Sequence, residues 1–170
     1  EANMSLLTET PALDLYDQDW VIHTQSEQRP AALVGEEARV EGNLLCDGCR
    51  IDGTVIRSII SPGVYVAKGA EVRDSIIMTD SVIESGAIVD RAILDKRVRV
   101  EGHVVLGFGD GMSPNRAFPD RLNSGLSVAG KGAVLPAGVK IGRNVIIYPR
   151  MKATDFPVSG EVKSGETLGG

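Results

Sequence analysis

Aliphatic residues recur along this chain at steps of five or six residues, and this repeat constrains the fold more than any other feature of the sequence. From residue 34 to residue 106 the step averages about 5.5, and after a gap three further steps of six follow. The repeating positions are Val34, Val40, Leu45, Ile51, Ile56, Ile60, Val66, Val72, Ile77, Ile83, Val89, Leu94, Val100 and Leu106, then Ala129, Leu135, Ile141 and Ile147. At all eighteen positions the residue two places earlier is small or β-branched.

This spacing matches a short strand followed by a sharp corner. Residues two apart point to the same side of an extended segment, so each small residue and its aliphatic partner face inward together. An α-helix would instead repeat its apolar positions at three and four. Three strands per coil, about 16 to 18 residues, close a triangular prism whose coils stack about 4.8 Å apart through parallel ladders. The sequence therefore predicts an all-β fold, a parallel β-helix of hexapeptide repeats.

Composition agrees with this fold and excludes several function classes. Aromatic residues make up 4% of the 170 residues, which suits an interior too narrow for Phe or Trp. The net charge of −5 disfavours binding to nucleic acid or to an anionic membrane. The sequence has no apolar stretch of the ~18 residues that span a bilayer. Two cysteines form no disulfide framework, so we expect a cytoplasmic protein.

Interruptions of the repeat divide the chain. Residues 1–31 are predicted to hold the end of a helix, stopped at Thr10-Pro11, and a polar linker. Residues 32–151 form the β-helix, with an inserted loop at 107–125 that is rich in Gly and Pro. Residues 152–170 are predicted to be a C-terminal tail. The open ends of a β-helix expose unpaired strand groups, so we expect the linker and the tail to cap them.

Most motifs that suggest chemistry have a structural explanation. The pair Cys46 and Cys49 lacks the two further ligands that tetrahedral zinc requires, so we predict no metal site. The stretch 130–132 (GKG) lacks the spacing of a phosphate loop and reads as a corner. His103 has no visible acid partner and is expected to be a surface residue. We predict no catalytic residues in this chain.

A basic cluster at Lys96, Arg97 and Arg99 is the candidate binding site. The repeat places Lys96 and Arg97 at a corner and turns Arg99 outward. Two or three cations on one edge can hold a phosphate, arginine through its planar fork and lysine as a point charge. Asp95 and Glu101 offer the alternative that these cations form ordinary surface ion pairs.

Three segments in order resemble one enzyme family. These are Glu1-Ala-Asn-Met-x-Leu-Leu7, then Tyr16-Asp17-x-x-Trp20-x-Ile22-x-Thr24, then the hexapeptide array. Over essentially the whole chain they resemble the C-terminal region of bacterial glucose-1-phosphate adenylyltransferase (ADP-glucose pyrophosphorylase). The resemblance implies a left-handed β-helix and a regulatory and oligomerisation role, with catalysis in a domain that this chain lacks. That domain would use Mg²⁺, while this chain itself would hold no cofactor and would be inactive alone.

The resemblance also implies partners and an effector site. The expected partners are the chain's own catalytic domain, further copies in a homotetramer, and a phosphorylated-metabolite or nucleotide effector. The family's effector-contacting arginine matches Lys96, and Arg97 and Arg99 follow as weaker candidates. Two alternatives remain open: the β-helix of another sugar-phosphate nucleotidyltransferase, such as a mannose-1-phosphate guanylyltransferase, or a hexapeptide acyltransferase that uses His103.

Overall fold

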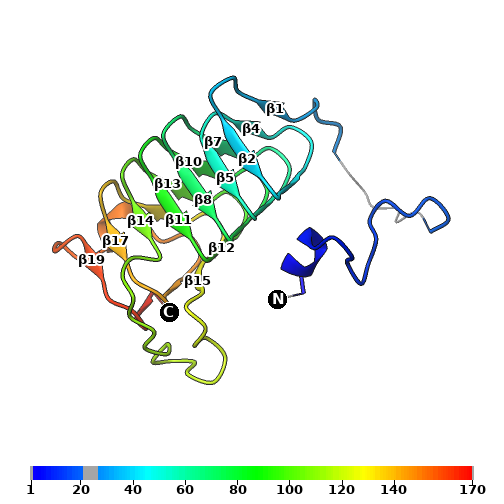
Figure 1. The fold of residues 1–170 in the computed structure, drawn as a ribbon. Coiled ribbons are helices and arrows are strands. Elements are labelled where there is room, and N and C mark those ends of the chain that lie inside the picture. Colours follow the sequence, from blue (N-terminus) through cyan, green and yellow to red (C-terminus); the bar gives the residue numbers. More distant parts are fainter. Residues whose placement is uncertain (1, 21–26, 170) are drawn as a thin grey trace.

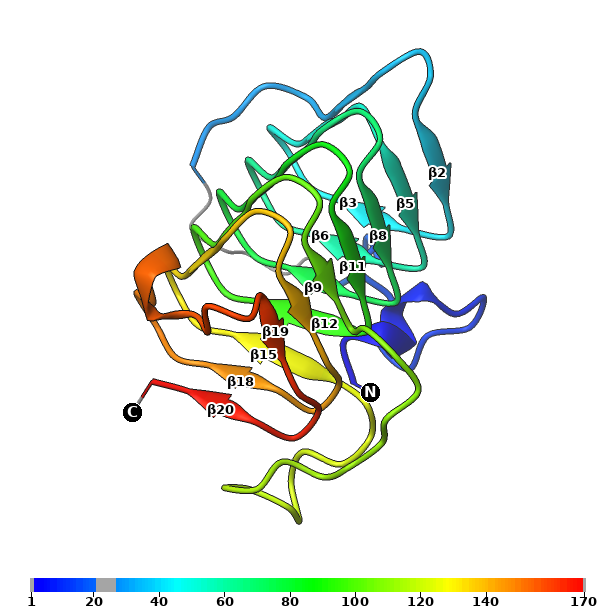
Figure 2. The ribbon, with the colours of Figure 1, turned by 90° about the vertical axis from the view of Figure 1, so that its left-hand side faces the viewer.

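The computed structural model describes residues 2–20 and 27–169, and it is a parallel β-helix built from three sheets (Figures 1 and 2). Sheet A contains β1 (Leu33–Val34), β4 (Arg50–Ile51), β7 (Tyr65–Val66), β10 (Val82–Ile83), β13 (Arg99–Val100) and β16 (Val134–Leu135). Sheet B contains β2 (Arg39–Glu41), β5 (Thr54–Ile56), β8 (Glu71–Arg73), β11 (Ile88–Asp90), β14 (Val105–Leu106), β17 (Lys140–Ile141) and β19 (Glu161–Val162). Sheet C contains β3 (Leu44–Leu45), β6 (Ile59–Ile60), β9 (Ile76–Ile77), β12 (Ala92–Leu94), β15 (Ser127–Ala129), β18 (Ile146–Ile147) and β20 (Thr167–Leu168).

Each strand pairs in parallel with its equivalent in the next coil. In the regular part of the β-helix the partner lies 17 residues further along, as for Tyr65 with Val82 and Val82 with Arg99. This register carries one residue of each coil directly above the equivalent residue of the coil before it. The predicted all-β fold is confirmed, and the architecture agrees with the left-handed form of a hexapeptide β-helix.

Most aliphatic positions of the repeat form three inward stripes, one per sheet. The prediction was wrong at Ile56, which is only partly buried, because Val55 is the residue that pairs with Val40 and Val72 and faces inward. In sheet A the stripe is Ile51, Val66, Ile83, Val100 and Leu135; in sheet B it is Val55, Val72, Val89, Leu106, Ile141 and Val162; in sheet C it is Ile60, Ile77, Leu94, Ala129 and Ile147. Every one of these side chains is at most 1% exposed. Burial of each Val, Leu or Ile side chain among them contributes about 1.5–3 kcal/mol, so the stripes are the main source of stability.

The small residues two places earlier turn the chain at the corners. Between sheets B and C several of them carry a buried hydroxyl that accepts a backbone N–H of the next coil. Ser58 Oγ accepts from Ser75 N at 3.2 Å, and Ser75 Oγ accepts from Ala92 N at 3.0 Å. Ser127 Oγ accepts from Val145 N in the same way. These bonds satisfy backbone N–H groups that have no partner in the strand ladders because the chain turns at the corner.

The N-terminal segment differs from the prediction. Where the sequence predicts the end of a helix at residues 1–9, the structure has a single 3-10 turn, η1 (Met4–Leu7). The expected cap at this end is not found in the described chain, since Leu33 is 57% exposed and Val34 is 46% exposed in β1. Part of the junction motif, including Ile22 and Thr24, lies outside the described residues. No helix among the described residues is long and apolar enough to cross a membrane.

Residues 152–170, predicted to be a tail, continue the β-helix instead of covering its end. β19 pairs with β17 and β20 pairs with β18, and in both cases the partner lies 21 residues away. The extra length holds a second 3-10 turn, η2 (Ala153–Asp155), which stands where sheet A would have its next strand. Sheet A therefore ends one strand earlier than the other two sheets.

The loop at 107–125 leaves the β-helix between β14 and β15 and packs back onto its last coils. Its anchor is Asn115, which is fully buried and whose Nδ2 donates to Asn144 O at 3.0 Å and to Glu166 O at 3.1 Å. Asn144 in turn donates from Nδ2 to Ser113 O at 3.0 Å and accepts Gly125 N at 2.7 Å. The insertion is thus bound to the β-helix at several points along its length.

Truncation of an inward stripe should cost far more stability than the same truncation on the outer surface. We expect Ile77→Ala to lower the free energy of unfolding by about 2–5 kcal/mol, because a fully buried side chain leaves a cavity. Ile88→Ala removes the same atoms from a side chain that is 36% exposed and should cost clearly less. Urea unfolding followed by circular dichroism measures both, and equal losses would contradict the assigned inner and outer faces.

Candidate functional site: a basic corner

The corner between sheets C and A carries four cations in its last three coils. Backbone hydrogen bonds align these coils: Gly132 N donates to Lys96 O at 2.9 Å, and Arg150 N donates to Lys131 O at 2.9 Å. Lys96 and Lys131 therefore occupy the first corner position of successive coils. Arg97, Gly132 and Arg150 occupy the second position, each with positive φ. We call Lys96, Arg97, Lys131 and Arg150 the basic corner.

These four side chains are exposed and, within residues 2–20 and 27–169, none of them forms an ion pair. The two acids that offered the surface-pair alternative bind backbone amides instead. Asp95 Oδ1 accepts Lys96 N at 2.6 Å, and Glu101 Oε2 accepts Ala137 N at 3.0 Å. Neither carboxylate therefore neutralises the positive charge of the basic corner.

Arg99 is separated from Lys96 and Arg97 by the corner itself. It lies in β13 on the outer face of sheet A, where its Nη1 pairs with Glu84 Oε1. The structure thus brings Lys96 and Arg97 together with Lys131 and Arg150, and engages Arg99 with a carboxylate elsewhere.

Sequence reasoning did not find Lys131 and Arg150. Lys131 stands 35 residues after Lys96, which is one regular coil plus the inserted loop, and its flanking glycines suggested only a corner. That corner is confirmed, since a Cβ at Gly130 would lie 2.6 Å from Pro149 N. The sequence did contain a signal. The repeat restarts at Ala129, which pairs with Leu94, and Lys131 follows Ala129 by two residues as Lys96 follows Leu94.

Gly132 leaves a gap in the basic corner. It lies between Arg97 and Arg150 in the stack, and an added Cβ would meet Arg150 Cγ only at 3.8 Å. The side chains of Arg97 and Arg150 therefore have free space between them, above the backbone of Gly132. Guanidinium and ammonium groups are the donors best suited to phosphate, and this edge carries two of each.

The two cysteines are free thiols, of which Cys49 is buried and Cys46 is partly buried. Cys49 is 1% exposed, and its Sγ lies 3.1 Å from Ser61 O. Burial raises the pKa of both thiols above the usual range, so the thiolate that metal binding or redox exchange requires is disfavoured. Among the described residues no group of His, Cys, Asp or Glu is arranged to hold a metal ion.

His103 lies at a corner between sheets A and B with φ of +60°. Its ring covers Gly86, where an added Cβ would lie 2.4 Å from Nδ1. In the described part of the chain its side chain makes no hydrogen bond to a carboxylate. A general base held by an acid partner, as the acyltransferase alternative requires, is not formed here.

The outer face of sheet C carries a column of aliphatic side chains. These are Leu44, Ile59, Ile76, Ile93, Val128 and Ile146, paired one above another and each partly exposed. Figures 1 and 2 both show η1 near β12 of this sheet. A continuous apolar face of this kind is typical of a surface that packs against further protein.

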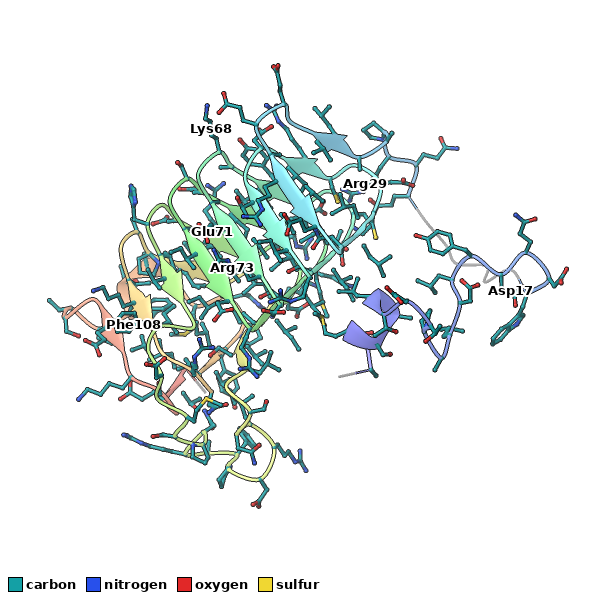
Figure 3. The ribbon with its side chains drawn as sticks, viewed as in Figure 1. Asp17, Arg29, Lys68, Glu71, Arg73 and Phe108 are labelled. Carbon is teal, nitrogen blue, oxygen red and sulfur yellow. The ribbon has the colours of Figure 1, made fainter. Side chains whose placement is uncertain are left out.

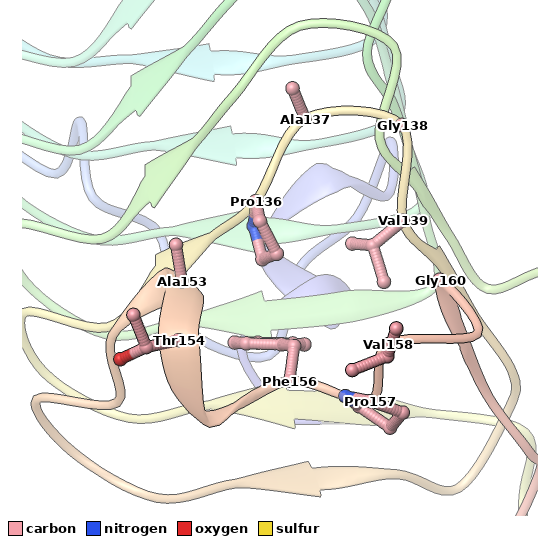
Figure 4. Close-up of a pocket in the computed structure, with 10 residues that line it drawn as sticks. All are labelled: Pro136, Ala137, Gly138, Val139, Ala153, Thr154, Phe156, Pro157, Val158 and Gly160. Atoms are coloured by element: carbon pink, nitrogen blue, oxygen red, sulfur yellow. The ribbon is translucent and has the colours of Figure 1, made fainter.

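A pocket of about 360 Å³ opens beside η2, where sheet A ends (Figure 4). Its lining is almost entirely apolar: Pro136, Ala137, Gly138, Val139, Ala153, Thr154, Phe156, Pro157, Val158 and Gly160. The only side chain among these with a polar atom is Thr154, so the pocket offers neither an acid nor a base for catalysis.

Comparison with known proteins places the chain. Residues 29–129 match the family described as "GlmU-like, C-terminal hexapeptide". A glucose-1-phosphate adenylyltransferase of Thermomicrobium roseum is 56% identical over 99% of this chain and 39% of its own length. Those of Acetivibrio thermocellus and Pseudothermotoga lettingae are 38% and 32% identical over 98% and 99% of this chain, and 40% of each relative. A solved structure from Desulfovibrio desulfuricans aligns over 74% of this chain and 24% of its own at 14% identity and a TM-score of 0.49, too low a similarity to support an inference.

The chain spans about two fifths of the length of these curated relatives. The similarity extends over nearly all of its residues, so the resemblance to glucose-1-phosphate adenylyltransferases is confirmed. The matched residues 29–129 run from the end of the linker to β15 and cover the regular coils. The chain belongs to the family of GlmU-like C-terminal hexapeptide domains.

Proposed function

We propose that this chain is the regulatory and oligomerisation β-helix of a cytoplasmic glucose-1-phosphate adenylyltransferase. The full-length enzyme would convert ATP and glucose 1-phosphate to ADP-glucose and pyrophosphate, with Mg²⁺, in a separate nucleotidyltransferase domain. The observation that carries the proposal is the 56% identity across 99% of this chain to one such enzyme. The described residues contribute binding surfaces to this enzyme and no catalytic group.

The regulatory role rests on the basic corner. Four cations that have no ion-pair partner among residues 2–20 and 27–169 form a local positive field at the end of one corner edge, on a chain whose net charge is −5. An anionic metabolite is the ligand that such a field favours, and a phosphate group matches both the arginine forks and the lysine point charges. The effector is therefore a phosphorylated metabolite or a nucleotide, bound chiefly by Lys96, Arg97, Lys131 and Arg150.

The structural role rests on two apolar surfaces. The aliphatic column on sheet C would pack against the catalytic domain, which would cover side chains such as Ile76 and Ile93. The first coil presents the unpaired edge of β1 together with the exposed Leu33 and Val34. An open strand edge with apolar side chains favours contact with another protein surface, which supports assembly into a homo-oligomer.

Removal of charge at the basic corner should weaken activation by the effector. In the full-length enzyme, Lys96→Ala combined with Lys131→Ala should raise the half-activating concentration of a sugar bisphosphate about tenfold, because two charge-assisted contacts are lost. Turnover without effector should stay within about twofold of the unchanged enzyme, since neither residue belongs to the catalytic domain. Initial-rate assays across an effector titration measure both quantities.

Lys68→Ala provides the matched control for this experiment. Lys68 is an exposed lysine at a corner between sheets A and B, where it pairs with Glu37 at 2.6 Å (Figure 3). Its loss removes one corner charge outside the basic corner and should leave activation unchanged. An activation curve that survives the double substitution, or one that Lys68→Ala shifts equally, would reject the effector site.

A charge in the aliphatic column of sheet C should detach the β-helix from the catalytic domain. We expect Ile76→Lys in the full-length enzyme to expose the linker to chymotrypsin and to separate the thermal unfolding of the two domains. Val82→Lys introduces the same charge at an equally half-buried outward position of sheet A and should do neither. Unchanged proteolysis and a single unfolding transition for Ile76→Lys would show that another face carries the domain contact.

A further inference from the structure

Arg29, at the end of the linker, lies at the first coils (Figure 3). It contacts the corner between sheets C and A, the corner that carries the basic corner in later coils. Its Nη1 donates to Asp80 Oδ1 at 2.6 Å, and its Nη2 donates to Glu27 Oε2 at 2.7 Å. The carboxylates of Asp80 and Glu27 raise the pKa of Arg29 further above its usual range. The carbonyl of Pro30, the next residue, accepts Gly48 N at 2.6 Å. These contacts fasten residues 27–30 of the linker to the corner.

Two glycines make room for this arginine. A Cβ at Gly63 would lie 1.9 Å from Arg29 Nη1 and 2.4 Å from Asp80 Oδ1, so the guanidinium occupies the place of the missing side chain. At Gly48 an added Cβ would lie 3.1 Å from Arg29 Cβ. The side chain of Arg29 is accordingly only 20% exposed, although it belongs to a linker. The ion pair is seated in a notch of the β-helix.

Asp80 connects this notch to the basic corner. Asp80 and Arg97 occupy the same position of successive coils: Asp80 N donates to Pro62 O, Arg97 N donates to Thr79 O, and their φ angles are +60° and +58°. Equivalent positions of adjacent coils are about 4.8 Å apart. The carboxylate of Asp80 therefore has Arg29 on one side and, one coil further, Arg97 of the basic corner on the other.

We propose that Arg29 and Asp80 form a latch that couples the linker to anion binding at the basic corner. In this structure Asp80 pairs with Arg29 and not with Arg97, so an anion that engages Arg97 offsets the attraction of Arg97 for Asp80 and strengthens the latch. Loss of Arg29 leaves Asp80 free to attract Arg97, which weakens the anion site. The coupling is reciprocal: if anion binding stabilises the Arg29–Asp80 pair, that pair must stabilise anion binding by the same free energy. The inference rests on the proposed function, since it requires an anion at the basic corner.

The first test measures anion affinity in the full-length protein by calorimetry, with fructose 1,6-bisphosphate as the probe. Arg29→Ala should weaken binding about two- to fivefold, the range expected when an exposed charge pair is changed. Asp80→Asn should strengthen binding by a similar factor, because it removes the competing carboxylate. Arg39→Ala is the matched control, since Arg39 forms an exposed pair with Glu41 at 2.7 Å on sheet B and should not change the affinity.

The second test follows the linker through hydrogen exchange at Gly48, whose amide is bonded to Pro30. The probe should slow this exchange in the unchanged protein. In Arg29→Ala the exchange should be faster and insensitive to the probe. Gly63→Ala should have the same effect through steric exclusion of Arg29, with both charges retained. Gly69→Ala is its control, because Gly69 also has positive φ, +78°, but an added Cβ would meet its nearest atom at 3.5 Å.

The outcomes separate the latch from the site on which it depends. If Lys96→Ala with Lys131→Ala leaves probe binding unchanged, the proposed effector site is wrong. If that double variant loses binding but Arg29→Ala and Asp80→Asn bind the probe like the unchanged protein, the effector site stands and the latch is rejected. An exchange rate at Gly48 that the probe does not alter in the unchanged protein also rejects the latch.

Discussion

The parallel register of the coils determines nearly everything else in this molecule. Each inward side chain lies against the equivalent residue of the next coil, 17 positions away in the regular coils, so an aliphatic residue in one coil requires another in the next. Polar groups are admitted to the interior where they bond across coils, as the serine hydroxyls between sheets B and C do. This requirement leaves little freedom inside the β-helix. Residue types can therefore vary mainly at the corners and on the outer faces.

The same register organises charge at the corners. One corner, between sheets C and A, repeats the same left-handed backbone in successive coils, yet its second position is Gly48, Gly63, Asp80, Arg97, Gly132 and Arg150 in turn. Glycine at the first coils leaves a notch that a linker arginine fills, and the last coils carry the cations of the proposed anion site. A single repeated backbone shape thus gives one edge two different functions. Asp80 lies at the boundary between them and is adjacent to both.

The sequence repeat predicted the sheets, the inward stripes apart from Val55, and the corner positions of Lys96 and Arg97, because strand period and coil length are local properties of the chain. It did not identify Lys131 and Arg150 as neighbours of Lys96, because the insertion at 107–125 obscures the count between coils. It also placed β19 and β20 in a tail, since η2 lengthens the last coil to 21 residues. Arg29 could not be placed, because a linker without a period does not indicate which glycines it will cover.

A β-helix of this kind is suited to transmit a binding event, because its parts are held by ladders that leave little room for internal rearrangement. An anion at the basic corner cannot easily change the packing of the buried stripes, whose side chains are already in contact at close to full burial. It can change the balance of charge along the corner edge, where Arg97, Asp80 and Arg29 follow one another. Residues 27–31 lead from that edge back toward the N-terminal segment, so a change at Arg29 acts on the connection to the rest of the protein without disturbing the β-helix.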